Sequence, residues 1–461
     1  MPSILDRPAA GDKSYVAAAG ELNPAGPDAL CCGAIVSTRS PAALMPALAL
    51  EWLNLALRWT HVIAAIMWIG DSFLFMWLDS SLAPPSRKRE GAVAGELWMV
   101  HSGGFYELVK RRYLAPDELP PKLHWFMWEA YATWISGFFL LGIVYYFGGG
   151  IFLVDRSVSA IGVPAAIGLS LGLLVAGWLV YDALWTSPLA RSPKVAGLVS
   201  FALIVALAYG LGRVFSGRAA FLHLGAVLGT IMAANVLRRI IPAQAHMLAA
   251  TRAGKPVDVT FGERAKMRSI HNHYLTLPVL FTMLSNHFPG TWGHPLAWLS
   301  LVLLVVLGAS VKYVMNFGSR SNRWIVLAGT ASLVGAIGLA VRAGAPAATA
   351  SAYRGDPPVT FATVRAIIES RCVTCHAAKP SNPAFPEPPL GVRLDEPERI
   401  AALAPRILAR AVVTETMPLG NLTGMTPEER RTLGAWIAQG AKTDDGAGAA
   451  PARRRAGGSG R

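Results

Sequence analysis

The sequence predicts an all-α protein: a polytopic membrane bundle of eight helices, followed by a small helical domain. Three observations lead to this prediction. The chain of 461 residues is 53% hydrophobic and only 15% charged, whereas soluble globular proteins carry about 25% charged residues. Apolar runs long enough to span a bilayer, about 20 residues each, recur between positions 51 and 342. Beyond position 358 the chain is no longer apolar enough to span.

The membrane domain is expected at residues 45–342, after an Ala-, Pro- and Gly-rich extension at residues 1–44 that we expect to be disordered. Its eight spans are expected at 51–78, 125–147, 160–184, 195–215, 219–241, 270–288, 295–317 and 323–342. The sixth span is the weakest, because histidines and an asparagine polarise its two ends.

The formal net charge of +14 does not indicate a nucleic-acid partner, because the basic residues gather in alternate loops between the spans. Loops 79–123, 186–194, 238–269 and 318–323 together hold eighteen Lys and Arg residues, whereas the other three loops hold only Arg156 and Arg218. Basic loops stay in the cytoplasm. Both termini are therefore expected on the opposite side of the lipid bilayer.

The C-terminal part is expected to comprise a linker at 343–358, a small domain at 359–442 and a disordered tail at 443–461. The last helix has a clear start signal, because Thr426 can cap it, Pro427 suits the first turn and Glu429 completes a capping box. An amphipathic segment begins at Phe361, and its ring is expected to pack against Trp436.

The sequence Cys372-Val373-Thr374-Cys375-His376 is a C-x-x-C-H motif, the attachment signature of haem c. Two thiols on one turn reach the two vinyl groups of the porphyrin, and the histidine supplies an imidazole to the iron. Met417 is the expected second iron ligand, with Met425 as its rival. A His/Met pair suits electron transfer. The small domain is therefore expected to resemble class I cytochromes c.

Two other interpretations of the motif are a thioredoxin-like redox pair and half of a zinc site. A zinc site needs further ligands, but no Cys follows Cys375 and no His follows His376. A thioredoxin fold needs βαβ patterning, which the sequence lacks. Bacterial haem c is attached outside the cytoplasmic membrane. The motif and the loop charges therefore agree on a periplasmic C-terminal domain of an inner-membrane protein.

Nine histidines lie in the membrane region or its loops, and ionisable groups at membrane depth suggest function. Eight of them fall into an outer set, an inner-edge set and a first-loop set: His61, His223 and His287; His246, His271 and His273; His101 and His124. Any one of them can simply form interfacial hydrogen bonds. As a group they support either a non-covalent haem b between helices or proton transfer at a substrate site. Asp71 lies inside the first span, where a carboxylate is least expected.

Three segments resemble the bacterial membrane-bound urate oxidase family. These are Glu51-Trp52-Leu53-Asn54-Leu55 through Arg58-Trp59-Thr60-His61 to Trp68-Ile69-Gly70-Asp71, then His101-Ser102-Gly103-Gly104-Phe105-Tyr106, and His271-Asn272-His273-Tyr274. The resemblance implies an eight-helix domain joined to a cytochrome c. It also implies oxidation of urate to 5-hydroxyisourate in purine degradation, with electrons passing to a downstream cytochrome c or terminal oxidase.

The resemblance carries over only the haem residues Cys372, Cys375, His376 and Met417. The candidate catalytic residues are taken from the membrane-depth argument alone: His61, Asp71, His271 and His273. Three other functions stay open, namely a quinol-to-cytochrome c oxidoreductase, a non-enzymatic membrane-anchored electron carrier, and a transporter fused to a redox domain. The hydrocarbon core is about 30 Å thick, so a urate site on the cytoplasmic side would need an intermediate cofactor.

Overall fold

The computed structural model describes residues 41–87, 91–344, 352–353 and 355–443. The expected N-terminal extension lies almost wholly outside this part of the chain, as do the C-terminal tail and half of the linker. By its internal contacts the chain divides after Glu51 into two units.

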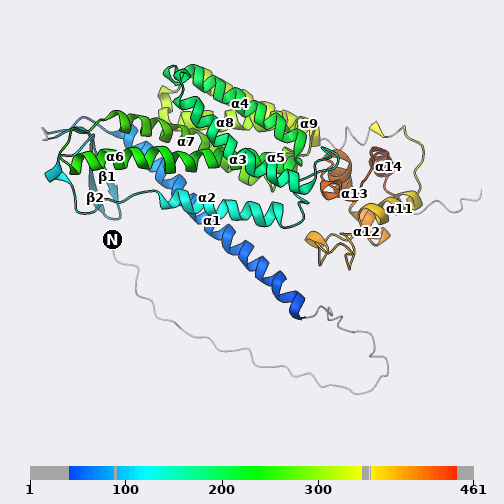
Figure 1. The fold of residues 1–461 in the computed structure, drawn as a ribbon. Helices are drawn as coiled ribbons and strands as arrows, with labels where there is room; N and C mark the ends of the chain where they lie inside the picture. The colour runs from blue at the N-terminus through cyan, green and yellow to red at the C-terminus, as the bar shows by residue number, and fades with distance from the viewer. Residues whose placement is uncertain (1–40, 88–90, 345–351, 354, 444–461) are drawn as a thin grey trace, which may run out of the picture. The chain divides into compact units, whose positions relative to one another are not determined.

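Helices make up most of the described chain (Figure 1). The long helices are α1 (Pro41–Ser81), α2 (Trp128–Leu141), α3 (Val163–Thr186), α4 (Pro193–Val214), α5 (Gly217–Asn235), α6 (Ile241–Arg252), α7 (Thr260–Ser285), α8 (Ala297–Phe317) and α9 (Arg323–Gly344). The C-terminal part contributes α11 (Phe361–Arg371), α12 (Pro397–Ala402), α13 (Ala404–Ile407) and α14 (Pro427–Ala438). One π-helical turn follows α2, and another joins α5 to α6.

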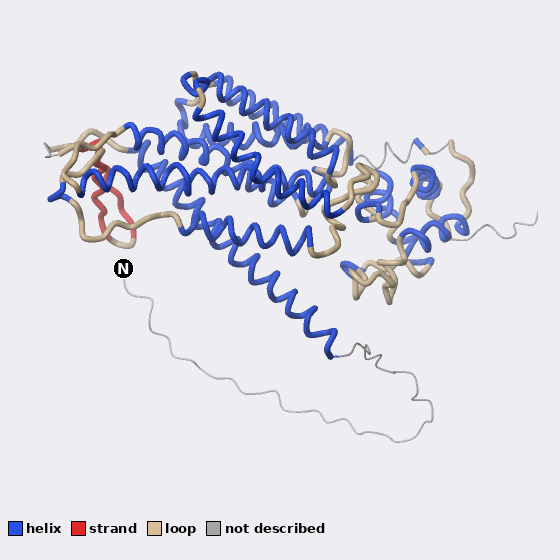
Figure 2. The backbone as a smooth tube through the Cα atoms, in the orientation of Figure 1, coloured by secondary structure: helices blue, strands red, loops and turns tan. Residues whose placement is uncertain are grey.

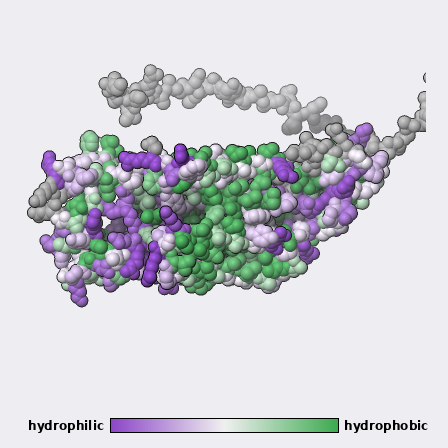
Figure 3. Space-filling view, turned by 90° about the horizontal axis from the view of Figure 1, so that it is seen from above, coloured by the Kyte–Doolittle hydropathy of each residue, from purple (hydrophilic) through white to green (hydrophobic). Residues whose placement is uncertain are grey.

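Six helices in the described residues are long and apolar enough to cross a membrane. They are Ala49–Ser81, Val163–Thr186, Pro193–Val214, Gly217–Arg252, Ala297–Phe317 and Arg323–Arg342. The second expected span corresponds to α2, which has only 14 residues. The sixth corresponds to α7, which carries several charged residues. On the face drawn in Figure 3, hydrophobic residues form a band across the middle of the described chain, and hydrophilic residues gather toward its two ends. The helical, apolar character is confirmed, and eight crossings stay a prediction.

The prediction of an all-α fold was wrong at one place. Strands β1 (Val93–His101) and β2 (Gly104–Arg111) form an antiparallel hairpin inside the first basic loop, with Val100 opposite Phe105. The two residues between the strands, Ser102 and Gly103, both have positive φ. A two-residue hairpin loop with a type I′ turn requires positive φ at both positions. Figure 2 shows the hairpin at the end of the bundle away from α11 and α14.

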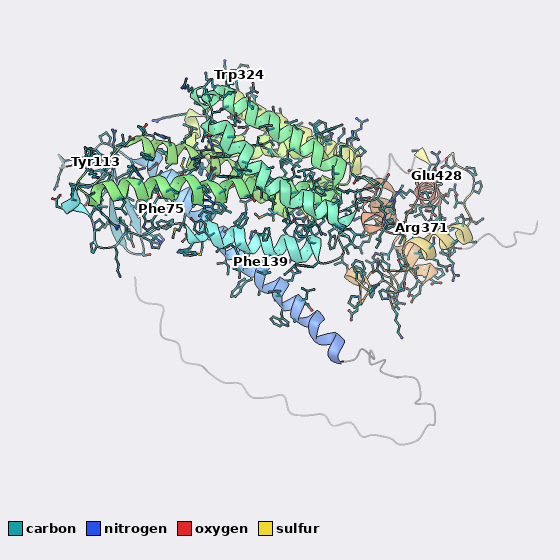
Figure 4. All side chains as sticks on the ribbon, in the orientation of Figure 1. Phe75, Tyr113, Phe139, Trp324, Arg371 and Glu428 are labelled. Atoms are coloured by element: carbon teal, nitrogen blue, oxygen red, sulfur yellow. The ribbon has the colours of Figure 1, made fainter. Side chains whose placement is uncertain are left out.

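The core of the bundle is built around α5, which packs against α3, α4 and α7. In the α5–α6 stretch, 67% of the most apolar 18-residue segment is buried, against 11% of the corresponding segment in α9. Close approach of α5 to α7 depends on Gly225, because a Cβ there would lie 1.9 Å from the Thr282 hydroxyl. Small residues have this role where helices pack in lipid. By contrast, Phe139 of α2 and Trp324 of α9 lie on the outside (Figure 4).

The C-terminal part has an apolar core of its own, formed by α11 to α14. The rings of Phe361 and Trp436 lie 5.9 Å apart, as expected from the sequence. Thr426 and Glu429 form the expected capping box at the start of α14. Arg371, labelled in Figure 4 at the end of α11, donates hydrogen bonds to Glu429 and so joins the first helix of this part to the last.

Candidate functional site

The two cysteines and the histidine of the C-x-x-C-H motif share a single turn at the end of α11. The helix ends at Arg371. The N–H groups of Cys375 and His376 both donate to the carbonyl of Cys372, at 3.1 and 2.9 Å. Both thiols are free. The turn therefore holds two sulfurs and one imidazole close together without a disulfide.

The imidazole of His376 has a defined orientation. Its Nδ1 lies 3.0 Å from the carbonyl oxygen of Val392, and a carbonyl can only accept, so Nδ1 carries the proton. Burial lowers the pKa of His376, although the hydrogen bond to Val392 acts in the opposite direction. The ring is therefore neutral near pH 7, and its Nε2 has a lone pair available to a metal ion.

The thiol of Cys372 lacks the activation of a redox-active cysteine. Burial, with a contribution from neighbouring Cys375, raises the pKa of Cys372 to about 12. Reactive cysteines of thioredoxin-like pairs have lowered pKa values. Within the described ranges, no three His, Cys, Asp or Glu side chains gather into a metal site. A neutral, buried thiol is compatible with a thioether bond.

A cavity of about 910 Å³ adjoins the motif and is lined by Cys372, Cys375, His376 and Met417. This volume falls in the range of cofactor sites, about 300–1,000 Å³. The rival methionine, Met425, is 3% exposed and belongs to the apolar core of the C-terminal part. It is not among the residues that line the cavity.

The opposite wall of this cavity comes from one end of the helical bundle, including Phe152, Arg218, Trp292 and His294. The Arg218 guanidinium lies 4.5 Å from the centre of the Phe152 ring and donates to Asn286. A backbone hydrogen bond of 3.2 Å links the N–H of Arg156 to the carbonyl of Gly420. The C-terminal part thus contacts the bundle directly beside the cavity.

Two of the four candidate catalytic residues lie near α2. Nδ1 of His61 lies 2.9 Å from the carbonyl oxygen of Thr133 and 3.1 Å from the Ser136 hydroxyl. Asp71 is half-buried and interacts electrostatically with Glu129 and His124. They are therefore held by different neighbours.

The other two candidates, His271 and His273, lie on α7 but point to different partners. His271 bonds to the Tyr181 hydroxyl at 2.7 Å and packs on Trp185 of α3. Nε2 of His273 bonds to Asn316 of α8 at 3.0 Å. Among the described contacts, none joins any two of the four candidates, so they do not form one constellation.

Sequence reasoning missed two buried charged groups in the bundle. Asp182 accepts hydrogen bonds from Arg239 and Arg268. Lys312 is only 3% exposed, and its Nζ lies 3.2 Å from the centre of the Phe73 ring. Asp182 and Lys312 are each a charged residue inside an apolar run, and this pattern could have identified both from the sequence.

A family model described as "Urate oxidase N-terminal" matches residues 47–341, more than half of the chain. The chain belongs to this urate oxidase family. The matched region covers the helical bundle from residue 47 in α1 to residue 341 in α9, and it ends before the C-x-x-C-H motif. No curated protein and no solved structure matches the chain. As a urate oxidase-related protein, it is expected to be an oxidoreductase that acts on urate.

Proposed function

We propose that this protein is a membrane-bound oxidoreductase that oxidises urate to 5-hydroxyisourate and passes the electrons to a haem c in its C-terminal part. Urate monoanion and water yield 5-hydroxyisourate, two electrons and one proton. Family membership supports the substrate. The six apolar helices support a membrane location.

The single observation that carries the electron route is the shared cavity of the two motif thiols, the motif histidine and Met417. When bound there, haem c supplies a one-electron carrier with no need for oxygen at the site. Cys372 and Cys375 would hold its vinyl groups, Nε2 of His376 would ligate the iron, and the Met417 thioether would complete the pair. Such a His/Met pair raises the redox potential, which suits an acceptor of substrate electrons.

The proposed topology follows the loop charges. Eight crossings would leave the basic loops in the cytoplasm and the C-terminal part in the periplasm of a bacterial inner membrane. A soluble cytochrome c or a terminal oxidase could then collect the electrons. Urate and lipid are the other partners of this proposal.

A second, non-covalent haem b in the bundle is also part of the proposal. The hydrogen bonds of the candidate histidines narrow the choice of its iron ligands. Both ring nitrogens of His223 are engaged, one by the Ala219 carbonyl at 2.7 Å and one by Ser170 at 2.6 Å. His61 has only Nδ1 in such bonds. Its Nε2 is therefore the better candidate for iron on this side of the bundle.

The test is anaerobic addition of urate to isolated membranes while the absorption band of ferrous haem c is recorded. We expect reduction to reach the level given by dithionite, and we expect none in a Cys372→Ser, Cys375→Ser double variant. A wild-type band that urate leaves unchanged would remove the proposal. Reduction by quinol but not by urate would instead favour a quinol-to-cytochrome c oxidoreductase.

A further inference from the structure

Lys312 is a cation placed in the bundle without a matching anion. It lies on α8, and no ion pair in the described part of the chain includes it. Burying an unpaired charge in a bundle is unfavourable, and such residues mark functional sites. The ring of Phe73 on α1 offsets part of this through a cation–π contact, with 3.2 Å between Nζ and the ring centre.

His273 on α7 supplies an unsatisfied hydrogen-bonding atom beside this cation. The residue is fully buried, and Nε2 lies 3.0 Å from the Asn316 side-chain oxygen. Because that oxygen can only accept, Nε2 carries the proton and Nδ1 is an acceptor. Nδ1 is buried and has no hydrogen-bond partner among the described residues, which is unusual enough in folded proteins to need an explanation.

The same aromatic ring connects the two groups. Phe73 meets the His273 ring edge-on, with centroids 5.5 Å apart, and it also carries Lys312 on its face. Three helices, α1, α7 and α8, thus bring together a cation, a buried hydrogen-bond acceptor and an apolar ring. A flat anion that has a ring N–H is complementary to all three. A carboxylate lacks the N–H, and phosphate lacks the flat apolar faces.

We propose that Phe73, His273 and Lys312 form the urate-binding site, an inference that rests on the function proposed above. Lys312 neutralises the urate monoanion, Nδ1 of His273 accepts a hydrogen bond from a ring N–H, and Phe73 contacts the ring system. His273 was a candidate from the sequence, whereas Phe73 and Lys312 were not.

This site lies far from the cavity beside Cys372. Trp292 and His294, which line that cavity, immediately precede α8 at Ala297. Lys312 comes fifteen residues later in the helix, a rise of about 22 Å at 1.5 Å per residue. In the proposed topology it lies toward the cytoplasmic side. Urate would enter there, and an intermediate redox group would carry electrons along the bundle.

The experiment is equilibrium dialysis of radiolabelled urate against the purified full-length protein, fully reduced with dithionite. Reduced protein cannot oxidise urate, so the measurement reports binding alone. We expect Lys312→Met to weaken urate binding at least tenfold, because a charge-assisted hydrogen bond is lost. Lys312→Arg, which keeps the charge, should retain binding within a few-fold of the wild type.

The matched control is Lys266→Met, which removes a lysine paired with Asp79 and should leave the affinity unchanged. Covalent haem content and the unfolding midpoint report whether each variant has folded. Wild-type affinity in folded Lys312→Met, with urate still reducing the wild-type haem, would overturn this inference and leave the proposed function standing. Wild-type protein that neither binds urate nor is reduced by it would overturn both.

Discussion

Contact between the C-terminal part and the bundle can be tested at Gly420. This residue has φ +56, and a Cβ built on it would lie 2.7 Å from the carbonyl oxygen of Val154 and 3.1 Å from that of Ile151. Both neighbours are backbone atoms, which cannot move aside cheaply. Gly391 is a matched control, because its φ is +66 and nothing lies within 4 Å of a Cβ there.

The expected magnitude follows from these two environments. Alanine in the left-handed region costs about 1 kcal/mol at either position, so this contribution cancels between the two variants. Only Gly420→Ala also breaks the hydrogen bond from the Arg156 N–H to the Gly420 carbonyl, a loss of about 1 kcal/mol. The contact should therefore weaken roughly fivefold in Gly420→Ala relative to Gly391→Ala.

Hydrogen exchange followed by mass spectrometry measures this effect directly. Peptides that contain the Arg156 amide should exchange faster in Gly420→Ala and at the wild-type rate in Gly391→Ala. If the proposed haem c is present, its reduction by urate should slow in the same variant while covalent haem content stays constant. Equal exchange at Arg156 in both variants would refute the proposed role of this contact.

Three further outcomes are expected. Met417→Ala should lower the midpoint potential of haem c in a redox titration, whereas Met425→Ala should leave the potential unchanged and lower the unfolding temperature; the reverse result would make Met425 the ligand. Although partial burial opposes its ionisation, hydrogen bonds from Arg371 and the Thr426 N–H lower the pKa of Glu429. The stabilisation that ionised Glu429 contributes should therefore be fully present above its unfolded-state pKa of about 4.3. It should be lost as the pH falls through the lower pKa of the folded state. Melting curves of Glu429→Gln should accordingly lose part of the wild-type acid dependence, and parallel acid dependence in both proteins would contradict this. Pyridine haemochrome analysis should show haem b besides haem c, because a urate site at Lys312 needs a relay; haem c alone would favour a urate site beside the outer cavity.

The sequence predicted features that depend on local patterns. Apolar length located the six helices that could span a membrane, and the spacing in Cys372–His376 located a turn that the structure shows. The cap of α14 was equally local, because Thr426 and Glu429 lie three residues apart. The hairpin around Ser102 and Gly103 was missed, because Leu97 to Val100 form an unbroken apolar run, whereas a half-buried strand is recognised by alternating polar and apolar residues.

The proposed urate site of Phe73, His273 and Lys312 could not be predicted from the sequence, because it depends on which faces of α1, α7 and α8 meet. Sequence position gives the depth of His61, Asp71, His271 and His273 in a span but not the direction in which each points. The four residues consequently have separate partners. An unpartnered Nδ1 on His273 follows from Asn316 on another helix, and no pattern within α7 indicates it.

The separation between Lys312 and the cavity beside Cys372 has an energetic consequence. In the proposed topology, each electron taken from urate would move from the negative to the positive side of an energised membrane. The membrane potential would assist this movement by at most about 2.3 kcal/mol per electron for every 100 mV, the value for a charge that crosses the whole membrane. Urate oxidation would thus draw on the potential that respiration maintains. An uncoupler added to intact cells should slow reduction of the haem, although it touches neither the substrate nor the protein.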